Sequence, residues 1–350
     1  MPNSQKNCKE MTKKQIRESQ FELLRLVAMF FIIMHHLIIK GADTVGYITP
    51  YSFDEHGVVG VVINSFCICA VNLFVLITGW FGIKNILKGV IRLIIDCAVF
   101  GAISYFTLCI FSEHFFSIKE CIKSLFFTPN WFVSVYMMLI LISPLIEYAV
   151  KALDVDKLKY IVIALLVVDV FFGFCFKYNN GYDLTHFVSM YCLARLMRHS
   201  CEEKWNIILS KYGFWIYFLG AIVLSIGFIA LNKLGIKMPA LGYFLYNNPL
   251  IILMAMAIFL WFSKCKIQSK FINVFATGVF GTFILHTTPY VIPVRNEYTH
   301  MIFQQFGYMG VFVACILLFF VCCLLSIFVN RYNQKLTNYF TNNVIERNLL

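Results

Sequence analysis

The chain has 350 residues, of which 60% are hydrophobic and 13% are charged, whereas an ordinary soluble domain has roughly 25% charged residues. This composition excludes a soluble globular protein and predicts an all-α integral membrane bundle. The net charge of +11 does not indicate a nucleic-acid partner, because the Lys and Arg residues lie in short segments between apolar runs, where they set orientation in a membrane.

Apolar runs long enough to cross a bilayer recur along the chain, and they predict about ten transmembrane helices. We expect a cytoplasmic N-terminal segment (1–20), one membrane domain (21–330) and a cytoplasmic C-terminal tail (331–350). The candidate spans are 21–39, 57–82, 91–111, 131–150, 160–177, 184–198, 212–231, 245–263, 271–291 and 308–330.

The sixth candidate, 184–198, is short, and the distribution of basic residues decides whether it spans. With ten spans, 21 of the 29 Lys and Arg residues fall on the side of the N-terminus, 7 fall on the other side, and Arg25 lies inside the membrane. Without the sixth span the two sides become equal. The positive-inside rule therefore favours ten spans in a cell membrane, with both termini in the cytoplasm.

The 13 cysteines lie mostly within apolar runs, where they act as small hydrophobic residues. Their spacing shows neither a disulfide framework nor a zinc motif. The sequence therefore predicts no metal site.

The first span, FELLRLVAMFFIIMHHLIIK, carries four polar residues that are costly to bury: Glu22, Arg25, His35 and His36. Arg25 and His36 are eleven positions apart and project from the same helix face, whereas His35 points about 100° away. Glu22 precedes Arg25 by three positions and can pair with it. This face could line a cavity with Arg25 at its cytoplasmic mouth and a histidine base deeper in. Alternatively, Arg25 snorkels to the interface and His36 makes a hydrogen bond between helices.

Four later residues are also candidates for a cavity. His36 lies about 22 Å above the cytoplasmic edge of a core roughly 30 Å thick, and the ninth span places His286 at a similar height. Asp169, near the middle of the fifth span, could accept a proton, orient a histidine or make a structural hydrogen bond. Trp131 is expected in an aromatic belt at the outer boundary or against a sugar ring. Asn130 could line the cavity, although helix packing explains it as well.

Four segments resemble, in the same order, those of the acyltransferase-3 family of membrane O-acyltransferases, which modify surface polysaccharides and related glycans. The first runs from Phe21 to His36, with an arginine after a Leu-Leu pair and a histidine eleven positions later. The others are VNLFVLITGWFGIK (71–84), NWFVSVYMMLILISPLI (130–146) and GTFILHTTPY (281–290).

The resemblance implies an acyl-CoA donor, commonly acetyl-CoA, which enters from the cytoplasm as a co-substrate and is not a bound cofactor. It also implies an acceptor glycan, or its lipid-linked precursor, near the outer side of the membrane. By this analogy His36 is the general base, His35 is its less suitable substitute, and Arg25 helps to hold the donor. Where the family commonly has a paired-arginine motif, this chain has other cations that could bind the donor: Lys84, Lys88 and Arg92.

Two other classes of protein fit the buried polar residues less completely. A transporter or flippase of lipid-linked oligosaccharide would use them as a substrate path. A sensor or assembly partner without catalysis would not need polar groups at matched depths. The sequence leaves the acyl group, the sugar, a covalent acyl-enzyme and the oligomeric state open.

Overall fold

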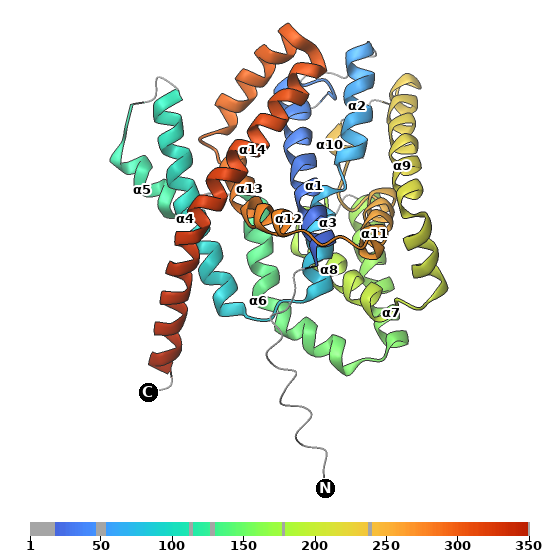
Figure 1. The fold of residues 1–350 in the computed structure, drawn as a ribbon. Helices are drawn as coiled ribbons and strands as arrows, with labels where there is room; N and C mark the ends of the chain where they lie inside the picture. The colour runs from blue at the N-terminus through green and yellow to red at the C-terminus, as the bar shows by residue number, and fades with distance from the viewer. Residues whose placement is uncertain are drawn as a thin grey trace.

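The computed structural model describes residues 18–46, 54–111, 115–126, 130–176, 179–236 and 240–348. Within these ranges the regular secondary structure is entirely helical (Figure 1). The expected cytoplasmic segment 1–20 lies almost wholly outside the described residues.

The helices differ widely in length, and several of the apolar runs are divided between two or more helices. In chain order they are α1 (Ser19–His36), η1 (Leu37–Ala42), α2 (Glu55–Cys67), α3 (Ala70–Phe81), α4 (Ile86–Phe111), α5 (Ile118–Phe126), α6 (Trp131–Ala152), α7 (Val155–Leu166), η2 (Val167–Cys175), α8 (Leu184–His199), α9 (Lys204–Lys233), α10 (Ala240–Tyr243), α11 (Pro249–Lys264), α12 (Lys270–Phe275), η3 (Ala276–Gly278), α13 (Val279–Thr287) and α14 (Ile292–Asn348).

Helix α1 lies at the centre of the bundle (Figure 1). It packs against α2, α3, α11, α13 and α14, and the aliphatic side chains along its length, such as Leu24 and Ile33, are fully buried. Around this centre, α9 packs on α11, α3 on α8, and α14 on α4. The central position of α1 places its polar residues inside protein instead of against lipid.

Seven helices of the described chain are long and apolar enough to cross a membrane. They confirm a multi-pass bundle, whereas the count of ten stays a prediction. Three of the ten candidates are shorter pieces: 184–198 is the 16-residue helix α8, 245–263 is the 16-residue helix α11, and 271–291 is divided among α12, η3 and α13. Such broken helices are tolerated at membrane depth where they are buried in protein or line a cavity.

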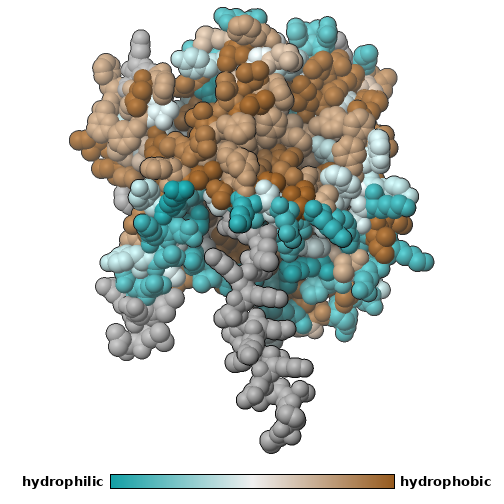
Figure 2. Space-filling model, in the orientation of Figure 1, coloured by the Kyte–Doolittle hydropathy of each residue, from teal (hydrophilic) through white to brown (hydrophobic). Residues whose placement is uncertain are grey.

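The outer surface suits a lipid environment. Large apolar side chains are exposed on many helices, among them Ile110, Leu145 and Met309. On the face shown in Figure 2, apolar side chains cover the upper and middle part, and polar side chains gather in the band beneath it. This distribution is the one expected of a membrane-embedded protein.

The last helix is longer than its predicted span 308–330. Helix α14 begins at Ile292 and is bent at Gly307, whose φ of 57° is a left-handed conformation that favours glycine. It continues to Asn348, so the expected tail 331–350 is helical through that residue.

Close helix packing depends on small residues at particular points. A Cβ atom at Gly79 of α3 would lie 2.6 Å from the carbonyl oxygen of Tyr191 on α8. Any larger residue at this position would therefore push α3 and α8 apart.

Candidate active site

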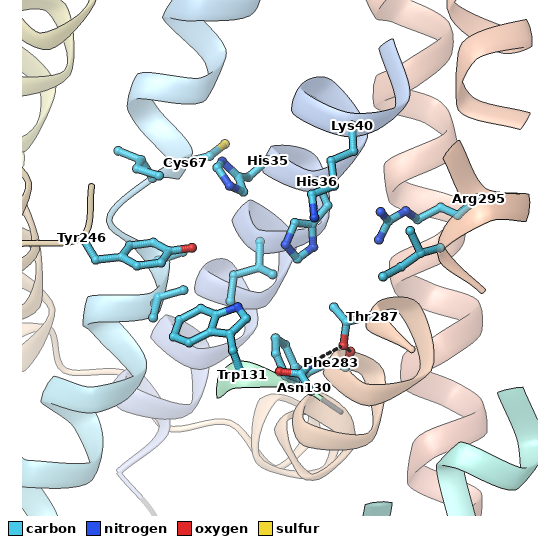
Figure 3. A pocket seen from close by; sticks show the side chains of 15 residues that line it. His35, His36, Lys40, Cys67, Asn130, Trp131, Tyr246, Phe283, Thr287 and Arg295 are labelled. Atoms are coloured by element: carbon cyan, nitrogen blue, oxygen red, sulfur yellow. Dashed lines mark hydrogen bonds between the residues drawn. The ribbon is translucent and has the colours of Figure 1, made fainter. Parts of the chain in front are cut away.

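A cavity of about 150 Å³ lies beside the C-terminal end of α1 (Figure 3). We call it the histidine cavity. Its walls come from α1 and η1, the break between α2 and α3, the first turn of α6, α13 and the start of α14. The residues that line it are Ile32, His35, His36, Lys40, Cys67, Ile68, Ala70, Val71, Asn130, Trp131, Tyr246, Phe283, Thr287, Ile292 and Arg295.

His36 lines this cavity and pairs with His286, which is fully buried and is not among the lining residues. Their matched depths made His286 a candidate partner. The distance between His36 Nδ1 and His286 Nε2 is 3.2 Å. The other nitrogen of His286, Nδ1, lies 2.7 Å from the carbonyl oxygen of Thr282 and must donate to it.

This chain of hydrogen bonds assigns the protons when both rings are neutral. Because His286 Nδ1 carries a proton, its Nε2 is an acceptor, and His36 Nδ1 must donate to it. His36 Nε2 then has a lone pair that can accept a proton. The arrangement is that of a general base whose ring is oriented by a second histidine.

His35 contributes to the same cavity from another direction. Its Nδ1 lies 2.6 Å from Oδ1 of Asn64 on α2, so the ring is turned away from His286, as helix geometry predicts. His35 nevertheless lines the same cavity as His36. The physical reason is that the break between α2 and α3 extends the cavity around α1.

The backbone around the histidines departs from regular α-helix. Helix α1 continues after His36 as the π-helical turn η1, a feature that is frequent at functional sites. Helix α13 ends at Thr287, and the extended conformation of Thr288 suits the following Pro289. These breaks bring the ends of α1 and α13 together at the pair.

Trp131 and Asn130 both line the histidine cavity. The Trp131 ring stacks on Tyr246, with 5.7 Å between ring centroids, and is 37% exposed. Asn130 caps α6 by accepting from the Phe132 backbone N–H, and its Nδ2 donates to Thr287 Oγ1 at 2.9 Å. Both residues therefore belong to the cavity wall, and Asn130 also joins α6 to α13.

A second and larger cavity, of about 800 Å³, lies beside the N-terminal half of α1. We call it the arginine cavity, because its lining includes Arg25, Arg92 and Arg331. Arg25 pairs with Glu22 at 2.9 Å, and Arg92 pairs with Asp96 at 3.4 Å. The predicted face of α1 is thus present, with Arg25 in one cavity and His36 in the other.

The candidate donor-binding cations are divided by the fold. Arg92 lines the arginine cavity, whereas Lys84 and Lys88 do not. Lys84 is exposed at the turn between α3 and α4. Arg331 of α14 is a cation of this cavity that the sequence analysis did not identify, because it follows the last predicted span.

Ile32 and Phe283 line both cavities and form the wall between them. Ile32 is 4% exposed and lies one turn before His36. Phe283 is 6% exposed, and its ring centroid lies 4.9 Å from that of Phe132. The residues that the two cavities share are therefore both apolar.

Asp169 orients a histidine, but the histidine is His186 of α8. The carboxylate Oδ2 lies 2.7 Å from His186 Nδ1, and both side chains are fully buried. His186 Nε2 then lies 2.9 Å from Asn72 Oδ1, and Asn72 donates to the carbonyl oxygen of Tyr246. Asp169 does not line the histidine cavity. Its hydrogen bonds connect η2 and α8 to the cavity wall that Tyr246 forms.

Arg295 is the cavity residue that sequence reasoning missed. The polar stretch between the last two predicted spans places it in an outer loop, but it lies in the first turn of α14 and is 7% exposed. Its Nη1 donates to the carbonyl oxygen of His286 at 2.7 Å. Pro293 signals the start of a helix, and nothing in the sequence signals the burial.

No group of three His, Cys, Asp or Glu side chains in the described ranges could hold a metal ion. The titratable and polar side chains that line the histidine cavity include two histidines, Lys40, Arg295, Asn130 and Thr287.

The apolar helices indicate a multi-pass membrane protein with two cavities beside its central helix. A family model described as an acyltransferase domain, that of the acyltransferase-3 family, matches residues 18–328. The chain therefore belongs to the acyltransferase-3 family and is an acyltransferase. Searches among curated proteins and among solved structures found no match.

Proposed function

We propose that the protein transfers an acetyl group from acetyl-CoA to a hydroxyl of a cell-envelope polysaccharide or of its lipid-linked precursor. The observation that carries this proposal is the hydrogen-bonded chain that runs from His36, which lines the histidine cavity, through His286 to Thr282. The family supplies the acyltransferase activity, and the site suggests how it is performed.

In the proposed reaction the acceptor hydroxyl oxygen attacks the carbonyl carbon of the thioester. His36 Nε2 takes the hydroxyl proton, and His286 stabilises the imidazolium through the hydrogen bond at His36 Nδ1. The tetrahedral intermediate collapses to the ester as the C–S bond breaks. The proton on His36 then passes to the leaving thiolate, which restores the neutral base.

The two cavities suit the two substrates. The arginine cavity, at about 800 Å³, falls in the usual range of roughly 300–1,000 Å³ for cofactor-sized ligands, and its arginines could bind the phosphates of CoA. The histidine cavity, at about 150 Å³, would admit only the reacting part of a glycan and a small acyl group. This difference in size favours acetyl over longer groups.

The orientation follows the distribution of charge. We place both termini in the cytoplasm, with ten crossings of the cell membrane. The arginine cavity then opens toward cytoplasmic acetyl-CoA, and the histidine cavity lies in the outer half, nearer to the envelope glycan.

The test is the transfer of label from radiolabelled acetyl-CoA to an envelope glycan by protein in lipid nanodiscs. His36→Ala should reduce transfer about 10²- to 10⁴-fold, the usual contribution of a general base. His35→Ala is the matched control, because the neighbouring ring lines the same cavity without contacting His286, and it should retain most activity.

Size-exclusion chromatography and thermal unfolding establish that both variants are folded. Full transfer by His36→Ala would reject the assigned base. If acetyl-CoA is not consumed with any envelope glycan, the acetyltransferase proposal fails, and transport of a lipid-linked oligosaccharide becomes the function to test.

A further inference from the structure

Arg295 differs from three other arginines of the bundle, each of which pairs with a carboxylate. Arg25 pairs with Glu22, Arg92 with Asp96, and Arg195 with Glu147 at 3.1 Å. Arg295 is 7% exposed, which makes it more buried than the side chains of Arg25, Arg92 or Arg195. It makes no ion pair with any carboxylate in the described part of the chain.

The hydrogen bonds of Arg295 satisfy only part of its guanidinium. Nε and Nη2 donate to Asn296 Oδ1 at 3.2 and 2.8 Å, and Nη1 donates to the His286 carbonyl oxygen. An arginine has five N–H donors, so two remain without an acceptor among the described residues. Figure 3 shows the guanidinium pointing across the cavity toward His36.

The lining of the histidine cavity has positive side chains and no acidic ones. Arg295 and Lys40 contribute to it, and none of the lining residues is Asp or Glu. For Arg295, burial without an anionic partner among the described residues is unfavourable. A ligand that brings a negative charge into the cavity would be stabilised by this field.

We propose that the acceptor carries an anionic group, a carboxylate or a phosphate, and that Arg295 binds this group while the hydroxyl that receives the acyl group lies at His36. The inference rests on the proposed function and adds the chemical class of the acceptor. The planar guanidinium can offer two parallel N–H groups to a carboxylate or phosphate. Because Arg295 also holds the His286 carbonyl oxygen, an anion bound there is placed beside the histidine pair.

The experiment compares matched neutral and anionic sugars as acceptors for wild-type protein in nanodiscs. Methyl β-D-glucuronide against methyl β-D-glucoside tests the carboxylate. N-acetylglucosamine 1-phosphate against N-acetylglucosamine tests the phosphate, and inorganic phosphate alone tests a free anion as a competitor. We expect kcat/KM for the preferred anionic sugar to exceed that for its neutral partner at least about tenfold, as expected for a charge-assisted contact.

Two substitutions assign the preference to this residue. Arg295→Gln should remove the preference for the anionic sugar. Arg295→Lys keeps the charge but loses the two parallel N–H groups of the guanidinium, so it should lower the preference severalfold. Equal rates for neutral and anionic sugars in the wild type overturn the proposal, as does a preference that survives both substitutions. A uniform loss with all acceptors, including water in acetyl-CoA hydrolysis, also overturns it, because Arg295 would then serve the reaction centre or the fold.

A binding readout separates this inference from the proposed function. In the absence of donor, the anionic sugar should raise the unfolding temperature of the wild type more than the neutral sugar does. This shift together with no consumption of acetyl-CoA would reject the acetyltransferase but keep the anion site. Consumption of acetyl-CoA without a shift or a preference would reject the anion site alone.

Discussion

Replacement of His286 tests the proton assignment at the site. In the wild type, His286 Nε2 lies 3.2 Å from His36 Nδ1 and accepts its hydrogen bond. The substitution His286→Leu removes this acceptor. A hydrogen bond to a charged group contributes about 1.5–3 kcal/mol, and the His36 imidazolium is charged only during the reaction. Since about 1.4 kcal/mol corresponds to a tenfold change in rate, we expect kcat to fall about 10- to 150-fold.

His286→Gln is the matched variant. Its amide oxygen can accept from His36 Nδ1, so it should recover part of the activity that leucine loses. The assay is single-turnover transfer from radiolabelled acetyl-CoA, with thermal unfolding to establish that His286, which is fully buried, can be replaced without loss of the fold. A rate for His286→Leu within twofold of wild type would refute the reasoning. Equal loss in folded Leu and Gln variants would show that accepting the proton is not the role of this side chain.

Three further outcomes follow from the fold. Arg25→Ala should raise KM for acetyl-CoA about 5- to 30-fold with little change in KM for the acceptor, whereas Lys84→Ala, outside both cavities, should match wild type in the same assay. Gly79→Val should lower stability by about 1–3 kcal/mol because its Cβ meets the α8 backbone, while Gly89→Ala, with 3.6 Å to its nearest neighbour, should unfold close to the wild-type temperature. Asp169→Asn should cost about 3–5 kcal/mol by breaking a fully buried pair; unfolding at the wild-type temperature would contradict this.

The matched depth of His36 and His286 could be predicted because it depends on two regular quantities. Helical rise gives the depth of each residue within its span, and the positive-inside rule gives the direction in which each span runs. The common face of Arg25 and His36 follows from the same periodicity. These rules act within one helix or against the membrane plane, so they need no knowledge of how helices pack.

The parts that sequence reasoning missed depend on contacts between helices. Arg295 looks like a loop residue because polar neighbours surround it, and only the packing of α14 beside α13 buries it. His35 points away from His36 on the helix, yet the break between α2 and α3 extends the cavity to it. Asp169 was recognisable as a buried partner, but its choice of His186 depends on how η2 and α8 meet.

The apolar wall gives a reason why acyl transfer to the acceptor would be faster than hydrolysis of the thioester. Ile32 and Phe283 lie between the arginines of the arginine cavity and the histidine base. In the proposed reaction a small acyl group passes between two apolar side chains, and the phosphates of CoA are held by charge on the other side. Water that fills the larger cavity then meets the thioester without a base beside it, and the base meets the thioester only in a cavity too small to hold much water. In this proposal the distance between Arg25 and His36 along α1 keeps the nucleotide of the donor away from the cavity in which the acyl group is transferred.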